Sequence, residues 1–531
     1  MSVLVPPTAG RPTDEGWLAA ESAPPPEPPG GAQVRDPAER LGPPMPTDRL
    51  RGWLVTLSLA LLGGLVRFWN LAHPTDKGTP VFDEKHYVPQ AWQVLRNGGY
   101  EDNPGFRLVV HPPLGKQLIA VGEWLFGYNG LGWRFTAAIA GTVCIILIVR
   151  IARRLTRSTF LGALAGVLLV ADGVSHVQSR VGMLDIFLTV FVVAGFGALL
   201  VDRDLVRNRL ATAVREGWAT TDGYGPRLGF RWWRFAGGVL LGLAIGVKWS
   251  ALFFVAAFAV LCVFWDVTAR RAAGVRHPWR GTIVRDLAPA FLSLAILPVL
   301  VYFGTWWAWY ASETGVDRHL VGSTLAEGGT WGWVPDALRA LLYNNSEVLT
   351  FHNNLSPAEK HPYESKPWAW PMGLKPMLYY LESNGVVPGC GRTDCMAGVK
   401  LIGTPAMWWL AFPMLGWAVW RAFGKLDWRY AAVLVGYGAG WLPWFSNLDR
   451  QMYYFYATPM APFMVLGLVL ILGEVLGRAT DGVERRKTGL LVVALYVGLV
   501  IANFIWLWPV LNGDSVTPWR WQAEVWLPSW N

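Results

Sequence analysis

The chain has 531 residues, of which 53% are hydrophobic and only 16% are charged, and it contains 32 tryptophans. Long apolar runs recur from residue 52 to residue 511, which excludes a set of soluble domains and indicates a polytopic membrane protein, because a membrane-spanning helix needs about 20 predominantly apolar residues. The net charge of +9 does not indicate a nucleic-acid-binding protein, since excess Lys and Arg in a membrane protein usually lie in cytoplasmic loops.

The N-terminal residues 1–46 contain twelve prolines and no apolar periodicity, which predicts a disordered cytoplasmic tail. A basic cluster then precedes the first hydrophobic run, 52–72, and places the N-terminus in the cytoplasm. The loop that follows, 73–132, is therefore predicted to be external. It contains two predicted interfacial helices, 85–97 and 114–126, the first with its apolar side chains directed toward lipid: Val88, Trp92 and Leu95.

Ten further apolar runs can span the bilayer if some tilt is allowed, at a rise of about 1.5 Å per residue. They fall at 133–151, 159–174, 182–201, 233–247, 250–267, 287–309, 402–421, 430–446, 452–474 and 489–511. Connections rich in Lys and Arg alternate with short connections that carry one cation each, which fits an N-in, C-out topology with about eleven spans. The long connection 310–401 and the tail 512–531 are then external, and 47–511 forms one all-α transmembrane domain.

The first external loop carries an unusually polar stretch in an otherwise apolar chain, from Phe82 to Lys116. It contains an adjacent acid pair, Asp83 and Glu84, and closes with the run His-Pro-Pro-Leu-Gly-Lys at 111–116. An acid pair in a loop is often only solvated, so the pair alone does not define a site.

Three predicted external connections each contain a single cation: Arg180, Lys248 and Arg450. Each could be a side chain that reaches the membrane interface, but together they indicate an anion at the outer surface, where a lipid-linked phosphate is found. Asp185 lies just inside a predicted span, where an ionisable group is energetically costly and suggests function. A structural alternative is that Asp185 only pairs with Arg180.

A carboxylate beside several cations suits glycosyl transfer from a polyprenyl-phosphate sugar to a hydroxyl. The acceptor hydroxyl needs a base, whereas the leaving phosphate needs only positive charge. A single displacement of this kind inverts the anomeric centre. The external histidines lack a tight metal-ligand spacing, so the sequence predicts neither a metal site nor a cofactor requirement.

Four separated motifs carry a resemblance to a known family. They are Phe-Asp-Glu-Lys-His at 82–86, the run at 111–116, Gln-Ser-Arg-Val-Gly-Met-Leu-Asp at 178–185, and His-Pro-Tyr-Glu-Ser-Lys-Pro-Trp-Ala-Trp-Pro at 361–371. With these motifs the chain resembles the protein O-mannosyltransferase family over residues 50–510. The Pro-rich tail and the segment 447–456 are similar to the actinobacterial branch. The resemblance implies a type-C glycosyltransferase fold, polyprenyl-phosphate mannose as the donor, and Ser or Thr acceptors on proteins that cross the membrane.

The resemblance also implies roles for individual residues. Asp83 falls on the general base, Glu84 on its acidic neighbour, and Arg180 on an arginine that resembles a phosphate ligand. Lys248 and Arg450 are added to the phosphate site from the topology. The remaining predicted site residues shape the cavity or fall on the family motifs: His86, His111, Lys116, Asp185, His361, Tyr363 and Ser365. The long external loop is too short for the additional β-trefoil domain of eukaryotic members, so acceptors must be selected by other surfaces.

Two cysteines of the long external loop, Cys390 and Cys395, could form a local disulfide in an oxidising compartment, and two free thiols are the alternative. The expected partners are polyprenyl-phosphate mannose, acceptor proteins emerging from secretion and membrane lipid, with no nucleic acid. The expected location is the plasma membrane.

Two other functions compete with protein mannosylation. One is a related enzyme that uses another lipid-linked sugar or glycosylates a lipid or glycan. The other is a transporter or flippase of lipid-linked anions, which would predict charges near the bilayer midplane. The candidate residues gather on one side of the membrane, which favours an enzyme.

Overall fold

The computed structural model describes residue 41 and residues 45–103, 108–217, 223–321, 332–354, 361–383, 390, 392, 394–478 and 480–530. The predicted Pro-rich tail, 1–46, lies outside these residues except for positions 41, 45 and 46. Its predicted disorder stays a prediction.

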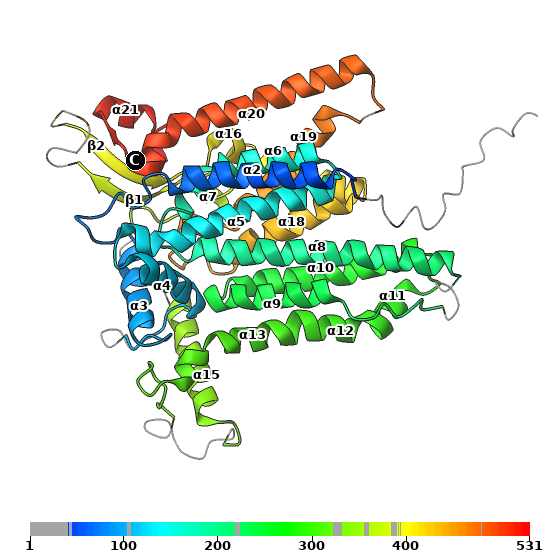
Figure 1. Ribbon diagram of the computed structural model, residues 1–531, viewed down its shortest axis with the longest axis horizontal. Coiled ribbons are helices and arrows are strands. Elements are labelled where there is room, and N and C mark those ends of the chain that lie inside the picture. The colour runs from blue at the N-terminus through cyan, green and yellow to red at the C-terminus, as the bar shows by residue number, and fades with distance from the viewer. Residues whose placement is uncertain are drawn as a thin grey trace, which may run out of the picture.

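Long helices run side by side along the long axis of the molecule and form its core (Figure 1). In chain order they are α2 (Arg49–Phe68), α5 (Gly130–Thr156), α6 (Thr159–Val170), α8 (Asp185–Arg215), α9 (Trp232–Val247), α10 (Ala251–Ala272), α17 (Ala411–Val419), α18 (Trp428–Trp441), α19 (Met460–Leu476) and α20 (Val483–Asn512). A further helical rod, Pro278–Thr305, consists of α11 (Pro278–Thr282), η1 (Ile283–Leu287), α12 (Ala288–Phe291), η2 (Leu292–Ile296) and α13 (Leu297–Thr305).

Each predicted span range contains helix. Six helical stretches in the described part of the chain are long and apolar enough to cross a membrane: Arg49–Phe68, Gly130–Thr156, Asp185–Arg215, Ala251–Ala272, Pro278–Thr305 and Val483–Asn512. The chain is thus a multi-pass membrane protein, while the total of eleven spans stays a prediction.

The helices that face outward carry apolar side chains on their exposed surface, as lipid requires. On α20, for example, Leu491, Leu495 and Leu499 are each about 60% exposed or more. Helices inside the bundle instead approach through small residues. A Cβ on Gly238 of α9 would lie 1.9 Å from the Ser293 carbonyl oxygen, so only glycine permits this contact.

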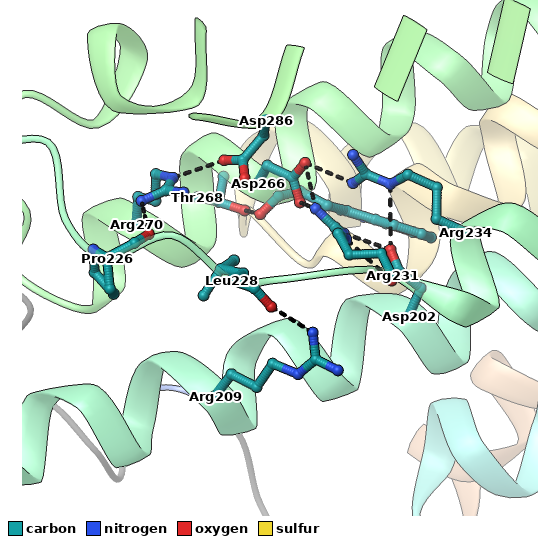
Figure 2. Close-up of polar contacts among 11 residues, drawn as sticks. Asp202, Arg209, Pro226, Leu228, Arg231, Arg234, Asp266, Thr268, Arg270 and Asp286 are labelled. Atoms are coloured by element: carbon teal, nitrogen blue, oxygen red, sulfur yellow. Dashed lines mark hydrogen bonds and ion pairs between the residues drawn. The ribbon is translucent and has the colours of Figure 1, made fainter. Parts of the chain in front are cut away.

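A network of buried charges joins helices of the bundle (Figure 2). Arg231, which precedes α9, contacts both Asp202 of α8 and Asp266 of α10, with 2.9 Å from Nη1 to each Asp266 oxygen. Arg234 on α9 reaches the same two carboxylates, at 2.5 Å to Asp266. Because every carboxylate here faces a guanidinium, the charges are paired as burial demands, and the network ties α8, α9 and α10 together.

Shorter elements gather at one end of the bundle, at the left of Figure 1. They include α3 (Glu84–Arg96), α4 (Leu114–Phe126) and α15 (Asp336–Asn353). The helices predicted at 85–97 and 114–126 are therefore present. The predicted orientation of α3 was wrong, because Val88 is fully buried in the core together with Ala91 and Val94.

A small three-stranded antiparallel sheet, which the sequence did not predict, lies at the same end of the molecule. Its order is β1 (Met377–Glu382), β2 (Met396–Leu401) and β3 (Ser515–Val516). β2 pairs with both neighbours, so the sheet joins the long connection 310–401 to the C-terminal tail, where α21 (Pro518–Ala523) follows. Cys390 and Cys395, in the connection between β1 and β2, form a disulfide.

Candidate active site

A cavity of about 410 Å³ opens where the loop 73–132 meets the ends of the bundle helices. Its polar lining comes from segments far apart in sequence: Asp83, Tyr87, His111, Asp185, Lys248, His352, Asn353, Asn447 and Arg450. Its apolar lining includes Leu188 on α8, Leu252 and Phe253 on α10, and Gly440 on α18. The cavity therefore combines a charged region with an apolar wall.

Asp83 presents its carboxylate to this cavity because of the residue before it. Phe82 has a φ of 46°, a left-handed conformation that non-glycine residues seldom adopt. Its ring stacks on Tyr379 of β1, with centroids 4.5 Å apart and planes 11° apart. This packing holds the turn in which α3 starts, so the long connection 310–401 helps to orient Asp83.

The two members of the acid pair have opposite environments. Glu84 is fully buried and accepts hydrogen bonds from Arg134 Nε (2.7 Å) and Nη2 (2.8 Å). Its oxygens also accept from the backbone N–H groups of Val81 (3.0 Å) and Gly182 (2.7 Å). The carboxylate of Asp83, by contrast, makes no capping bond and has no hydrogen-bond or ion-pair partner within the described chain. Glu84 is therefore a structural residue, which corrects its predicted place in the catalytic pair.

The surroundings of Asp83 favour a proton acceptor that works near neutral pH. The pKa of the Asp83 carboxyl is raised to about 6, mainly by burial and to a smaller extent by nearby Asp185, whereas His86 and Lys248 oppose the shift. A carboxyl with this pKa is ionised at pH 7 and still basic enough to accept a proton from a reacting hydroxyl.

Two of the three predicted phosphate ligands face the cavity. Lys248, at the end of α9, places Nζ 2.8 Å from Asp185 Oδ2, so Asp185 pairs with Lys248 and not with Arg180. Arg450 lies over the rings of Trp444 and Tyr456, with Cζ 5.4 and 5.7 Å from their centroids. Within the described residues Arg450 has no carboxylate partner. It is therefore a cation available to an anionic ligand.

Arg180 lies outside the cavity, which corrects its predicted role as a phosphate ligand there. Its Nη1 donates to the carbonyl oxygens of Arg67 (2.8 Å) and Trp69 (2.5 Å), and its Nη2 donates to that of Asn70 (3.4 Å). These carbonyls lie at the C-terminal end of α2, where backbone acceptors lack partners inside the helix. The guanidinium caps this helix end.

Two other predicted cavity residues do not line it. Lys116 is buried beside Glu101 and forms an ion pair with it, and His86 is exposed on α3. His111 does line the cavity, and burial lowers its pKa well below the ordinary value, with Lys248 and His352 contributing. The surroundings of His111 therefore favour its neutral form.

The long-loop motif at 361–371 contacts the segment that carries Arg450. Lys366 Nζ donates to the carbonyl oxygens of Leu448 (2.8 Å) and Arg450 (3.0 Å). Ser365 donates its N–H to the Met452 carbonyl (2.9 Å). His361 and Tyr363 do not reach the cavity either, and His361 meets the ring of Tyr453 edge-on at 5.3 Å. These residues position a loop, which corrects the prediction that they line the cavity.

Several cavity residues were not predicted. Tyr87 lies four residues after Asp83, so helical periodicity from the acid pair could have identified it. Tyr456 lies at the end of the segment 447–456, and Trp249 directly follows Lys248. No sequence pattern marks Phe253 or Gly440 as cavity residues, because they resemble the other apolar residues of their helices.

Comparison with known proteins identifies the family. A family model described as "Dolichyl-phosphate-mannose-protein mannosyltransferase" matches residues 57–133 and 129–309. A second, "C-terminal four TMM region of protein-O-mannosyltransferase", matches residues 337–530. Polyprenol-phosphate-mannose–protein mannosyltransferases of Mycolicibacterium smegmatis (strain MKD8) and Mycobacterium tuberculosis (strain H37Rv) are 54% and 55% identical over 487 residues. These alignments cover 91% of this chain and 94% and 93% of the relatives.

The chain belongs to the protein O-mannosyltransferase family. It is thus a membrane-bound mannosyltransferase, and its helical architecture is of the type-C glycosyltransferase class. The solved Saccharomyces cerevisiae Pmt1–Pmt2 complex bound to the sugar donor has the same fold, with a TM-score of 0.69 at 15% identity. That match covers 92% of this chain and 93% of the yeast chain.

In this mannosyltransferase, no group of three or more His, Cys, Asp or Glu side chains in the described ranges is arranged to hold a metal ion. The predicted independence from metal stays a prediction.

Replacing Glu84 with Gln should destabilise the enzyme strongly. The amide of Glu84→Gln is uncharged, so buried Arg134 loses its counter-ion. The NH2 group of the amide would also face N–H donors that it cannot accept from. Breaking one side of a buried ion pair costs about 3–5 kcal/mol. We expect a large drop in the apparent melting temperature of the purified protein in detergent. Asp83→Asn, one residue away, is the matched control and should melt no lower than the wild type. A Glu84→Gln variant that melts like the wild type would contradict this structural role.

Proposed function

We propose that the enzyme transfers mannose from polyprenyl-phosphate mannose to Ser or Thr hydroxyls of proteins, at the external face of the plasma membrane. The observation that carries the proposal is the free carboxylate of Asp83 in a cavity that also holds Lys248 and Arg450. The mycobacterial relatives bear names that specify the same donor and a protein acceptor, which supports the same substrates here.

In the proposed reaction, Asp83 accepts the proton of the acceptor hydroxyl while the hydroxyl oxygen attacks C1 of mannose. The bond from C1 to the phosphate oxygen breaks on the opposite side, so the anomeric centre inverts. Polyprenyl phosphate leaves with one more negative charge than it had in the donor. Lys248 and Arg450 lie where they can stabilise this charge, which we expect to make a metal unnecessary.

The apolar wall of the cavity suits the prenyl chain of the donor. Leu252 and Phe253 on α10 line the cavity and are 47% and 43% exposed. Leu442, next to the cavity residue Pro443, is 60% exposed. These side chains connect the charged region with the lipid-facing surface, so a chain could remain in the bilayer while its phosphate reaches Arg450.

The external location of the site rests on the distribution of charge. The sheet and α3, whose start bears the cavity residue Asp83, lie at the end of the bundle toward the connections that are poor in Lys and Arg. The connections 150–157 and 478–487, which contain four cations each, lie at the other end. The positive-inside rule then supports a cytoplasmic N-terminus and an extracytoplasmic active site.

The activity can be tested with purified protein, radiolabelled polyprenyl-phosphate mannose and a Ser/Thr-rich peptide. We expect labelled mannosyl-peptide from the wild type, and a loss of at least about 100-fold with Asp83→Asn, because general base catalysis typically contributes about 10²–10⁴-fold. Donor binding without acceptor should stay intact in Asp83→Asn. Transfer at near wild-type rate by this variant would disprove the base assignment. Parallel assays with other lipid-linked sugars test the choice of mannose.

The rate of transfer should depend on pH through Asp83. Only the ionised carboxylate accepts a proton, and burial raises its pKa to about 6. We therefore expect kcat/KM to be constant above about pH 7 and to fall about tenfold per pH unit below pH 6, as one protonated base predicts. Donor binding measured over the same range separates this effect from protonation of the donor. A rate that does not fall between pH 7 and pH 5 would exclude Asp83 as the base.

The phosphate site can be tested by donor binding. Hydrogen bonds to charged groups contribute about 1.5–3 kcal/mol, so Arg450→Gln and Lys248→Gln should each weaken binding by roughly 10–100-fold. Lys85→Gln removes an exposed cation of α3 that pairs with Asp76, and it should bind donor like the wild type. Equal donor binding by Lys85→Gln and Arg450→Gln would mean that the phosphate does not bind at Arg450.

A further inference from the structure

His352 lies at the point where three separate external segments meet. It is in the last turn of α15, at the end of the described part 332–354 of the long external loop. Its ring stacks on His111 of the first external loop, with centroids 5.2 Å apart and planes 28° apart. Its two nitrogens contact Val110 and Arg450. His352 therefore links the positions of the first external loop and of α15 to the position of the segment that bears Arg450.

The two contacts of the ring fix its tautomer. Nε2 lies 3.1 Å from the Val110 carbonyl oxygen, which can only accept a hydrogen bond, so Nε2 carries the proton. Nδ1 then holds a lone pair. It lies 3.3 Å from Nη2 of Arg450, which can only donate. Both contacts are therefore satisfied by a single form of neutral His352.

The electrostatic surroundings keep His352 in this neutral form. Burial lowers its pKa to about 4, and the positive charges of Arg450 and Lys248 lower it as well, while the bond to Val110 opposes the shift. An acidic side chain at this position would neutralise Arg450 and weaken its attraction for phosphate. A neutral acceptor instead fixes the guanidinium and leaves its full charge for the ligand.

Arg450 otherwise has little to hold it within the described chain. Its flat guanidinium lies over Trp444 and Tyr456, contacts that attract the cation but leave it free to turn in its own plane. Its Nε is buried without a hydrogen-bond partner. The bond to His352 is the directional contact that sets which nitrogen points into the cavity.

We infer that His352 is a positioning residue that aims Arg450 at the donor phosphate through its Nδ1 lone pair, with its tautomer set by the Val110 carbonyl. The inference rests on the proposed function, in which Arg450 binds that phosphate. It assigns to α15 a part in donor recognition: this helix holds the cation in place and does not itself contact the reacting atoms.

Two substitutions separate the nitrogens of His352. In His352→Asn the amide oxygen can occupy the place of Nδ1 and accept from Arg450. In His352→Gln the longer amide can reach the place of Nε2 and donate to Val110, but it offers Arg450 no acceptor at the position of Nδ1. Binding of radiolabelled polyprenyl-phosphate mannose is measured without acceptor, on the full-length protein in detergent, together with the apparent melting temperature of each variant.

We expect His352→Asn to bind donor within about threefold of the wild type and His352→Gln to bind about tenfold more weakly, which is about 1.4 kcal/mol. The difference should disappear in the Arg450→Gln background, because a residue that acts through Arg450 has no effect without it. Both variants should melt alike.

Other results would overturn the inference. Equal losses in His352→Asn and His352→Gln, or a difference that persists without Arg450, would mean that His352 acts through packing or directly on the donor. Wild-type binding by His352→Gln would mean that Arg450 needs no acceptor. Wild-type binding by Arg450→Gln would instead reject the phosphate site of the proposed function, whatever the His352 variants do.

Discussion

The ion pair between Glu84 and Arg134 is the constraint on which the active site depends. It joins the start of α3 to α5, and through the N–H of Gly182 it also holds the turn before α8. Both carboxylate oxygens of Glu84 already accept hydrogen bonds. The first turn of α3 therefore cannot rotate without leaving Arg134 buried and unpaired. This anchoring keeps the neighbouring carboxylate of Asp83 in the cavity. Two adjacent acids thus have different tasks because one is neutralised and the other is not.

The cavity holds charged groups that lack an oppositely charged partner within the described chain. The buried network around Arg231 and Asp266, by contrast, pairs its charges with one another. Inside the cavity, Asp83 has no partner within the described chain and Arg450 has no carboxylate. Unpaired charges of opposite sign are costly in a protein interior, and they persist where a ligand completes them. In the proposed reaction, the donor phosphate would pair with Arg450 and the acceptor hydroxyl would hydrogen-bond to Asp83.

The long connection 310–401 contributes more to the site than its sequence suggests. β1 supplies Tyr379, which stacks on the residue before Asp83, and the motif at 361–371 holds the segment that bears Arg450. α15 supplies His352, which contacts that arginine. None of these residues needs to meet the substrate to affect the reaction. The loop therefore acts as a frame for groups that lie on other segments, and this explains why its motif residues were mistaken for cavity residues.

The sequence alone determined the class of protein and the helical ranges, and it predicted which side of the membrane carries the candidate residues. These follow from apolar run length, charge alternation and motifs, which are local properties of the chain. It also identified Asp83, Lys248 and Arg450. Only the tertiary structure decided which of the other ionisable residues face the cavity, because their partners are remote: Glu84 meets Arg134 across 50 residues, and His352 meets Val110 across 242. Arg180 lies outside the cavity for the same reason, because its guanidinium donates to carbonyl oxygens at a helix end more than 100 residues earlier.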